Sequence, residues 1–257
     1  MRLQNKVAIV TGGSGGIGLA TVKRLASEGA KVVIADINEE GGQKAVEEVS
    51  RELGSEVLFI KTNVASYEAV VHLVERTVEE FGRLDIMFNN AGFAKAAPLL
   101  QHNPVEDFDP IVAVNQNGVY YGILAAARKM VELGIKGTII NTASVFGILP
   151  GELTFTYNAT KAAVINMTSS AAMELAPNGI RVVAIAPGRV NTPILSPYKD
   201  FGVWDQMVSE QMRGTLTEPM EIANAVAFLA SEEANCINGT CVNLDDGYSS
   251  FKARLFV

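Results

Sequence analysis

A glycine-rich segment, Thr11-Gly-Gly-Ser-Gly-Gly-Ile-Gly18, directly follows the apolar run 7–10. This order predicts a buried strand that turns sharply into a helix, whose N-terminal N–H groups can bind a diphosphate. The next apolar run, 32–35, ends at Asp36, where a carboxylate can accept hydrogen bonds from a ribose diol. An ordinary flexible loop explains neither the flanking strand nor Asp36. The segment therefore indicates a dinucleotide-binding turn.

The composition of the chain favours a globular protein that binds small molecules. With 257 residues and 48% hydrophobic composition, the chain can bury a large core and is not of the disordered class. No apolar run approaches the roughly 20 residues of a membrane span, and no signal peptide is evident. The net charge of −7 argues against a surface for nucleic acid. We expect a cytoplasmic protein that binds neither membranes nor nucleic acid.

The cysteines and histidines do not form a metal-binding pattern. Cys236 and Cys241 lack further ligands at zinc-site spacing, and too few cysteines are present for a disulfide framework. His72 and His102 have no partners at ligand spacing either. We expect buried cysteines, surface histidines and no metal.

Apolar runs alternate with amphipathic segments along the whole chain. The runs predict strands at 7–10, 32–35, 57–60, 84–88, 138–141, 181–186 and 241–244. Segments such as 42–53 and 66–81 predict helices, because their apolar residues recur three and four apart. No linker, repeat or charge block interrupts the alternation. Residues 1–257 are therefore predicted to form a single α/β domain, a doubly wound, mostly parallel sheet with helices on both faces.

Ordered motifs along the chain resemble the classical short-chain dehydrogenase/reductase (SDR) family. Within the glycine turn, the spacing alone also permits G-x-G-x-x-G at Gly13, Gly15 and Gly18. The spacing that resembles the family is T-G-x-x-x-G-x-G, formed by Thr11, Gly12, Gly16 and Gly18. The later motifs, in the family's order, are Asn89-Asn90-Ala91-Gly92, Asn115, Ser144, Tyr157-Asn-Ala-Thr-Lys161 and Pro187-Gly188. The resemblance covers nearly the whole chain and implies a seven-stranded Rossmann fold in the order 3-2-1-4-5-6-7.

Tyr157 and Lys161 are candidate catalytic residues. They stand four apart on a predicted helix and so share one face. A nearby ammonium group lowers the pKa of a tyrosine, which is near 10 when unperturbed. Ser144, thirteen residues earlier, can donate a hydrogen bond to a substrate carbonyl. The resemblance implies that Tyr157 is the general acid/base, that Lys161 assists it, that Ser144 holds the substrate, and that Asn115 holds a relay water.

The Tyr-x-x-x-Lys spacing occurs a second time, at Tyr248 and Lys252. Tyr248 follows the last predicted strand, has no serine at the matching spacing and precedes no helix-length segment. We therefore interpret Tyr248 and Lys252 as tail residues.

The cofactor is predicted to be NAD rather than NADP. Asp36 repels a 2′-phosphate, and the neighbouring positions of the turn supply no Arg or Lys. Asn63 and Val64 stand where the family usually has an acid, but an asparagine oxygen can still accept from an adenine amino group. By resemblance, the cofactor residues are Thr11, Gly12, Gly16, Ile17, Gly18, Asp36, Asn63, Val64, Asn90, Gly92, Tyr157, Lys161, Pro187, Gly188, Val190 and Thr192.

Residues 191–217 break the alternation of strands and helices and are candidates for a substrate lid. They contain several aromatic and proline residues at the carboxyl end of the sheet, where long connections cover ligand sites. A packed surface excursion is the alternative interpretation. In the family this region is the substrate-binding loop, and we expect it to be mobile. We expect Phe93, Phe146 and Leu149 to form the floor of a substrate pocket beside Ser144 and Tyr157. The expected substrate is a small secondary alcohol or ketone, and polyols and sugars remain alternatives.

The function predicted from these residues is NAD-dependent hydride transfer between the cofactor and a small secondary alcohol or ketone. A 3-oxoacyl-[acyl-carrier-protein] reductase is an alternative, but Met173 stands where a second basic residue is usual beside Arg128-Lys129, and the net charge opposes an acidic partner. A catalytically silent NAD-binding sensor or scaffold is a second alternative, opposed by the intact catalytic residues. An epimerase or dehydratase of the extended family would need a longer chain.

The resemblance also implies a homo-oligomer, with a tetramer expected. In the family, the helix that carries the tyrosine packs against a neighbouring subunit. Small residues on this helix, Ala159, Ala162 and Ala163, would allow close approach, although they could equally pack on the sheet.

Overall fold

The computed structural model describes residues 1–195, 198 and 202–250 and contains one seven-stranded sheet. All strand pairs are parallel, and the strand order β3-β2-β1-β4-β5-β6-β7 confirms the predicted fold class. The strands are β1 (Val7–Thr11), β2 (Lys31–Asp36), β3 (Val57–Lys61), β4 (Ile86–Asn89), β5 (Thr138–Thr142), β6 (Arg181–Pro187) and β7 (Cys241–Leu244).

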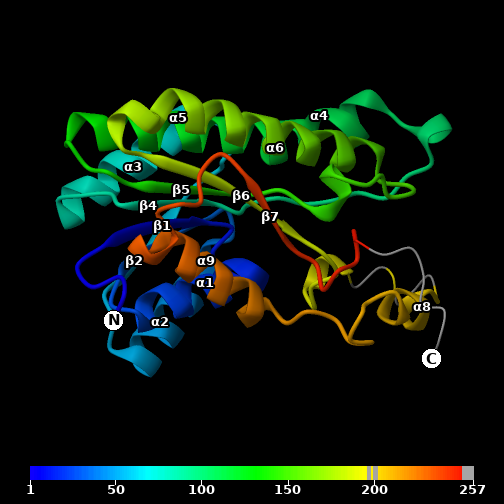
Figure 1. Ribbon diagram of the computed structural model, residues 1–257, viewed down its shortest axis with the longest axis horizontal. Coiled ribbons are helices and arrows are strands. Elements are labelled where there is room, and N and C mark those ends of the chain that lie inside the picture. The colour runs from blue at the N-terminus through cyan, green and yellow to red at the C-terminus, as the bar shows by residue number, and fades with distance from the viewer. Residues whose placement is uncertain (196–197, 199–201, 251–257) are drawn as a thin grey trace.

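Helices cover both faces of the sheet (Figure 1). One face carries α1 (Gly16–Ser27), α2 (Glu39–Leu53) and α9 (Pro219–Ala230). The opposite face carries α3 (Tyr67–Phe81), α5 (Gly118–Glu132) and α6 (Phe155–Leu175). Shorter elements are η1 (Leu99–Gln101), η2 (Pro104–Phe108), α4 (Asp109–Val112), η3 (Ala113–Asn117), η4 (Val145–Gly147), η5 (Ala176–Asn178), η6 (Pro193–Leu195), α8 (Trp204–Ser209) and η7 (Glu232–Ala234).

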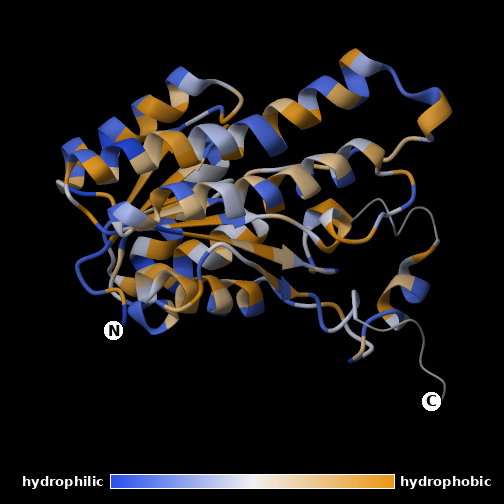
Figure 2. Ribbon diagram, turned by 45° about the horizontal axis from the view of Figure 1, so that its top comes forward, coloured by the Kyte–Doolittle hydropathy of each residue, from blue (hydrophilic) through white to orange (hydrophobic). Residues whose placement is uncertain are grey.

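Each central strand contributes side chains to both halves of the core. On β1, Ala8 and Val10 pack with α1 and α9, whereas Ile9 packs with α3 and α5. This division arises because successive side chains of a strand point to opposite faces of the sheet. Since both faces are covered by helices, the central strands are continuous apolar runs in the sequence. Figure 2 shows the hydrophobic strands between the two helical layers.

Capping residues set the ends of the two helices that the sequence predicted. The Asn38 side chain accepts a hydrogen bond from the Gly41 N–H, so α2 begins before the predicted residue 42. Ser66 caps α3 in the same way. Gly54 and Gly82 end these helices in the left-handed conformation, where glycine is favoured.

The fourth strand begins two residues later than the run 84–88 predicts. The Asp85 carboxylate accepts hydrogen bonds from the Val7 N–H and the Arg83 side chain. The carboxylate thus serves as the acceptor for the Val7 N–H, while the Asp85 N–H donates to the Val7 carbonyl, and the regular register begins with Ala8 and Ile86.

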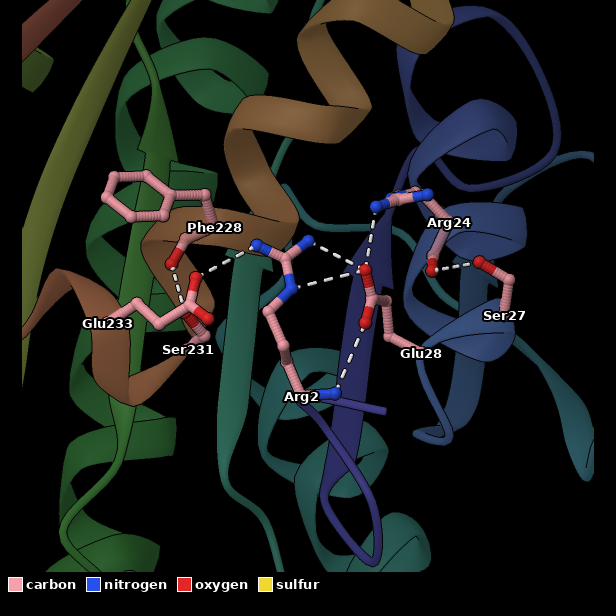
Figure 3. A network of polar contacts seen from close by, with 7 residues as sticks. All are labelled: Arg2, Arg24, Ser27, Glu28, Phe228, Ser231 and Glu233. Carbon is pink, nitrogen blue, oxygen red and sulfur yellow. Dashed lines mark hydrogen bonds and ion pairs between the residues drawn. The ribbon is translucent and has the colours of Figure 1, made fainter.

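An ion-pair network ties the N-terminal segment to α1 and to the turn after α9 (Figure 3). The Arg2 side chain donates to Glu28 at 2.6 Å and contacts Glu233 at 3.3 Å, and Arg24 donates to Glu28 at 2.7 Å. The Arg2 hydrogen bonds lower the pKa of Glu28 to about 2. Because Arg2 precedes β1, this network lies at the amino ends of the strands, opposite the edge reached by the glycine turn.

The predicted lid segment is closed at its base by a bridge between Val190 and Thr217. The Asn191 N–H donates to the Thr217 carbonyl, and the Thr217 N–H donates to the Arg189 carbonyl. The segment has more regular structure than expected, because it contains the short helix α8, whose Met207 is buried. Its Pro197 and Phe201 lie outside the described residues, as does Lys252 of the second Tyr-x-x-x-Lys motif.

Cys236 is exposed and Cys241 half-buried, so the expectation of two buried cysteines was wrong for Cys236. Among residues 1–195, 198 and 202–250, no helix combines the length and apolar character that crossing a membrane requires.

Candidate active site

The backbone of the glycine turn distinguishes between the two possible spacings. Gly12 and Gly16 have positive φ values of 63° and 52°, which favour glycine. A Cβ on Gly18 would lie 2.0 Å from the Gly12 carbonyl oxygen, whereas one on Gly15 would meet no described atom within 4 Å. The conformation therefore supports the T-G-x-x-x-G-x-G spacing. It also leaves the N-terminus of α1 open to a diphosphate, as the cofactor requires.

Thr11 and Asn90 join the glycine turn to the end of the neighbouring strand. The Thr11 hydroxyl accepts hydrogen bonds from the N–H groups of Asn90 and Ala91, at 2.9 and 3.1 Å. The Asn90 amide in turn donates to the Thr11 carbonyl at 3.0 Å. These contacts fix the spacing between the two turns that would flank a bound dinucleotide.

Asp36 lies beside the glycine turn, at the end of β2. Its carboxylate accepts hydrogen bonds from the Ser14 N–H at 3.1 Å, the Ser14 hydroxyl at 2.6 Å and the Asn38 N–H at 3.0 Å. A carboxylate has about four acceptor positions, so one remains for a ribose hydroxyl, and Ser14 holds the group in place. Asn63 is less free than expected, because its side-chain oxygen already accepts from the Ala65 N–H. Val64 is buried and packs against Gly118 of α5.

Ser144 and Tyr157 are joined by a side-chain hydrogen bond. Ser144 follows β5, and its hydroxyl also accepts from the Phe146 N–H at 3.2 Å, which fixes the Ser144 side chain. Burial raises the pKa of Tyr157 above its ordinary value, and the hydrogen bond from Ser144 opposes this rise. The sequence led us to expect a lowered pKa from Lys161. In the structure, the loss of hydration outweighs any such effect.

Lys161 is buried one helical turn after Tyr157. Its Nζ lies 5.5 Å from the centre of the Tyr157 ring and donates to the Thr142 carbonyl at 2.6 Å. Burial lowers the pKa of Lys161 to about 8. The ammonium group is therefore held close to its titration point inside the site.

Asn115 lies where the helix that leads into α5 widens. It is fully buried in a π-helical turn, η3, a distortion that is common at functional sites. Its side chain accepts from the Phe93 N–H at 3.0 Å and donates to the Phe93 carbonyl at 2.8 Å. A Cβ on Gly92 would lie 3.1 Å from the Asn115 oxygen and 3.5 Å from Lys161 Nζ. The absence of a side chain at Gly92 thus allows both Asn115 and Lys161 to approach the turn that contains Gly92.

The segment after β6 closes the site from the opposite side. A Cβ on Gly188 would lie 2.8 Å from the Cα of Asp245, so the chain approaches the C-terminal turn closely here. Thr192 lies against the glycine turn, since a Cβ on Gly16 would contact its methyl group at 3.3 Å. Val190 is buried between these two positions.

A cavity of about 320 Å³ contains most of the predicted site. The predicted residues that line it are Gly12, Gly16, Ile17, Asn90, Gly92, Ser144, Phe146, Tyr157, Lys161, Pro187, Gly188, Val190 and Thr192. The glycine turn, the open helix terminus and the adjoining polar side chains fit a nicotinamide dinucleotide.

Two of the residues expected to floor the pocket do not line this cavity. Phe93 and Leu149 are 37% and 41% exposed. The backbone N–H of Phe93, rather than its ring, contacts the site by donating a hydrogen bond to Asn115. Phe146 does line the cavity.

Arg189 and Tyr198 line the cavity, and Tyr248 packs against Arg189 and Phe146. The sequence interpretation placed Tyr198 in the lid but missed Arg189 and Tyr248. The Arg189 guanidinium carbon lies 5.0 Å from the ring centre of Phe146, 5.3 Å from that of Tyr198 and 5.7 Å from that of Tyr248. Tyr248 is half-buried and therefore not a simple tail residue. The sequence did contain one indication of these contacts, because Arg189 stands between Gly188 and Val190, in a segment that was expected to line the site.

Comparison with known proteins agrees with this geometry. A family model described as enoyl-(acyl carrier protein) reductase matches residues 12–249. The chain is 41% identical to a 2,5-dichloro-2,5-cyclohexadiene-1,4-diol dehydrogenase from Sphingobium indicum, over 96% of this chain and 98% of that protein. It is 37% identical to a cis-4-hydroxycyclohexanecarboxylate dehydrogenase from Sinomonas cyclohexanicum, over 95% and 97%. The crystal structure of levodione reductase superposes with a TM-score of 0.92 at 36% identity, covering 97% and 99% of the two chains.

The chain therefore belongs to the short-chain dehydrogenase/reductase family, as its motifs led us to expect. It is an oxidoreductase that acts on CH–OH groups with a nicotinamide cofactor.

Proposed function

We propose that this protein is an NAD-dependent dehydrogenase that interconverts a secondary alcohol on a small ring and the corresponding ketone. The observation that carries the proposal is the hydrogen-bonded pair Ser144 and Tyr157, with the buried Lys161 beside it, at an apolar cavity joined to the glycine turn. A bound nicotinamide supplies the hydride acceptor or donor.

Each catalytic side chain has a separate role in the proposal. Tyr157 takes the proton of the substrate hydroxyl during oxidation and returns it during reduction. Ser144 donates a hydrogen bond to the same oxygen as charge develops on it. Lys161 supplies positive charge that favours the phenolate, and Asn115 holds the route by which the proton reaches solvent.

The preference for NAD rests on Asp36. The carboxylate is held by Ser14 beside the glycine turn, and there it would accept from a free ribose diol and repel a 2′-phosphate. No arginine or lysine stands at the adjoining positions Gly15, Ile37 or Asn38.

The ring class of substrate rests on the cavity and on the relatives. Apolar groups from Val145, Leu195 and Phe146 line the cavity and suit an aliphatic ring. Two relatives are named for six-membered ring alcohols, one of which carries a carboxylate. Polyols and sugars fit this lining less well, because they require more hydrogen-bonding groups.

We further propose that residues 1–257, of which 196–197, 199–201 and 251–257 lie outside the described residues, function as one domain and that 191–217 form its lid. The bridge between Val190 and Thr217 brings the two ends of this segment together. Ile194, Leu195 and Tyr198 of the segment line the cavity.

Two other functions fit the structure less well. A carrier-protein reductase would need basic residues available at the surface, but Arg128 donates to Tyr67 and Lys129 pairs with Glu132, while Met173 is 74% exposed. A silent sensor or scaffold would not need the hydrogen-bonded catalytic group.

Steady-state kinetics with ring alcohols and both cofactors test the proposal. We expect reduction of NAD in the presence of cyclohexanol or a cyclohexanediol, with a higher kcat/KM for NAD than for NADP. Asp36→Ala should reduce that preference, and Glu40→Ala, an exposed acid on α2, should not. Equal or better use of NADP by the unmodified protein contradicts the cofactor assignment. Failure of every ring alcohol and ring ketone contradicts the substrate class.

A further inference from the structure

The Arg189 side chain is a largely buried cation that lines the cavity. Its side chain is only 12% exposed, and it lines the same cavity as Ser144 and Tyr157. Tyr198 places it relative to the reacting atoms: the Arg189 guanidinium carbon lies 5.3 Å from the Tyr198 ring, and the Tyr198 phenol is near enough to Tyr157 to raise the pKa of Tyr157. Arg189, Tyr198 and Tyr157 thus line one cavity together.

The contacts within the protein leave hydrogen-bonding capacity on Arg189. Its Nε is buried and has no hydrogen-bond partner among the described residues. Its Nη2 lies 3.8 Å from Glu210, which is too long for a hydrogen bond, and the Glu210 side chain is 37% exposed. The surrounding aromatic rings stabilise the positive charge but do not replace directional acceptors for the five N–H donors.

A carboxylate is the group that matches this arrangement. A guanidinium binds a carboxylate through two parallel N–H···O bonds, and a buried donor without a partner gains most from such an acceptor. Phe146 and Tyr198 line the same cavity as Arg189 and the catalytic pair, so the cavity offers apolar surface to the body of a six-membered ring.

We propose that Arg189 is a specificity-determining residue that binds a carboxylate on the substrate, so that the preferred substrate is a ring hydroxy acid. This inference rests on the proposed function and narrows it. The hydroxyl lies at Ser144 and Tyr157, and the carboxylate, on the far side of the ring, lies at Arg189. The reaction at the hydroxyl is unchanged: the alcohol carbon is oxidised, the hydride passes to the cofactor, and the proton passes to Tyr157.

The test compares two substrates of nearly the same shape, 4-hydroxycyclohexanecarboxylate and its uncharged carboxamide. We expect kcat/KM to favour the acid by about 10- to 100-fold, the range for a hydrogen bond to a charged group. In Arg189→Met this ratio should fall to about one. Arg189→Lys should restore only part of it, because an ammonium group lacks the planar pair of donors. Arg76→Met, on the exposed surface of α3, is the matched control and should keep the full ratio.

A second variant keeps the test decisive if Arg189→Met does not fold. Glu210→Gln removes the acid nearest to Arg189, and it should increase the inhibition of cyclohexanol oxidation by cyclohexanecarboxylate. Equal kcat/KM for acid and carboxamide in the unmodified protein, or no inhibition by cyclohexanecarboxylate, overturns the role of Arg189 and leaves the proposed function standing. Oxidation of neither substrate with NAD or NADP overturns both.

Discussion

At the scale of single residues, burial changes the proton affinities of Lys161 and Tyr157 in opposite directions. Loss of hydration disfavours the charged form of each group, so the pKa of Lys161 falls to about 8 and that of Tyr157 rises. At neutral pH the protein without ligands therefore keeps a neutral phenol at Tyr157 and a protonated Lys161 that begins to lose its proton near pH 8. Ionisation of Tyr157 then depends on added positive charge within the site, which links proton transfer to an assembled complex.

The lowered pKa of Lys161 predicts a pH dependence of stability. The folded protein loses the lysine proton near pH 8, whereas the unfolded chain keeps it until about pH 10.5. Below pH 8 the lysine is protonated in both the folded and the unfolded protein, and its buried charge destabilises the fold. Above pH 10.5 the lysine is neutral in both states. We expect the unfolding free energy, measured by denaturant titration against Lys161→Met, to rise by roughly 3 kcal/mol across this window. A difference that is independent of pH contradicts the assignment.

Tyr157→Phe removes the proposed proton acceptor and leaves the packing nearly intact. We expect kcat to fall by about 10²–10⁴, the usual contribution of a general acid or base, while the affinity for NAD measured by calorimetry persists. Tyr67→Phe is the matched control, because this phenol lies at the start of α3 and binds Arg128. If the two variants retain similar activity, Tyr157 is not the catalytic acid/base.

Sequence spacing predicted that Ser144, Tyr157 and Lys161 lie together, but it did not predict the surroundings of Arg189. Tyr157 and Lys161 share a helix face, and Ser144 ends a strand, so local geometry suffices to bring them together. Arg189 instead depends on contacts with Phe146 and Tyr248, which come from distant parts of the chain. Periodicity contains no information about such contacts, and for this reason Tyr248 was misinterpreted.

At the scale of elements, the site is built where strands end and helices begin. The glycine turn, the turn at Asn90, Ser144 and the segment after Pro187 all follow parallel strands. Since parallel strands end at one edge of the sheet, their positions could be predicted from the order of apolar runs alone. The helix α8 in the lid segment could not, because it is short and gains its stability from the buried Met207.

Limited proteolysis tests the lid. Segment 191–217 contains Arg213, a trypsin site whose side chain contacts Glu221 and Asp246 at the surface. We expect NAD together with a ring alcohol to slow cleavage in this segment, because closure over the ligands reduces local opening. Cleavage after Arg51, at the end of α2, provides the comparison within the same sample. Equal protection of both sites, or of neither, contradicts a lid that closes on the ligands.

At the scale of the whole molecule, the outer face of α6 is the best candidate for contact with a second copy. Ala159 and Ala162 are exposed, so they do not pack on the sheet, whereas Ala163 is half-buried. Met173 on the same helix is 74% exposed, and Tyr120 on α5 is 50% exposed. Small exposed residues on a long helix allow another helix to approach closely.

Sedimentation velocity tests the proposed homo-tetramer, and Ala162→Arg provides the informative variant. We expect the unmodified protein to sediment as a tetramer at micromolar concentration. An arginine at position 162 would place a charge and a long side chain where two α6 helices meet, so it should shift the protein towards dimers or monomers. Arg51→Ala, on the opposite face of the sheet, should leave the distribution unchanged. A stable monomer of the unmodified protein would contradict assembly through any surface, whereas a tetramer that tolerates Ala162→Arg would contradict the assignment to α6.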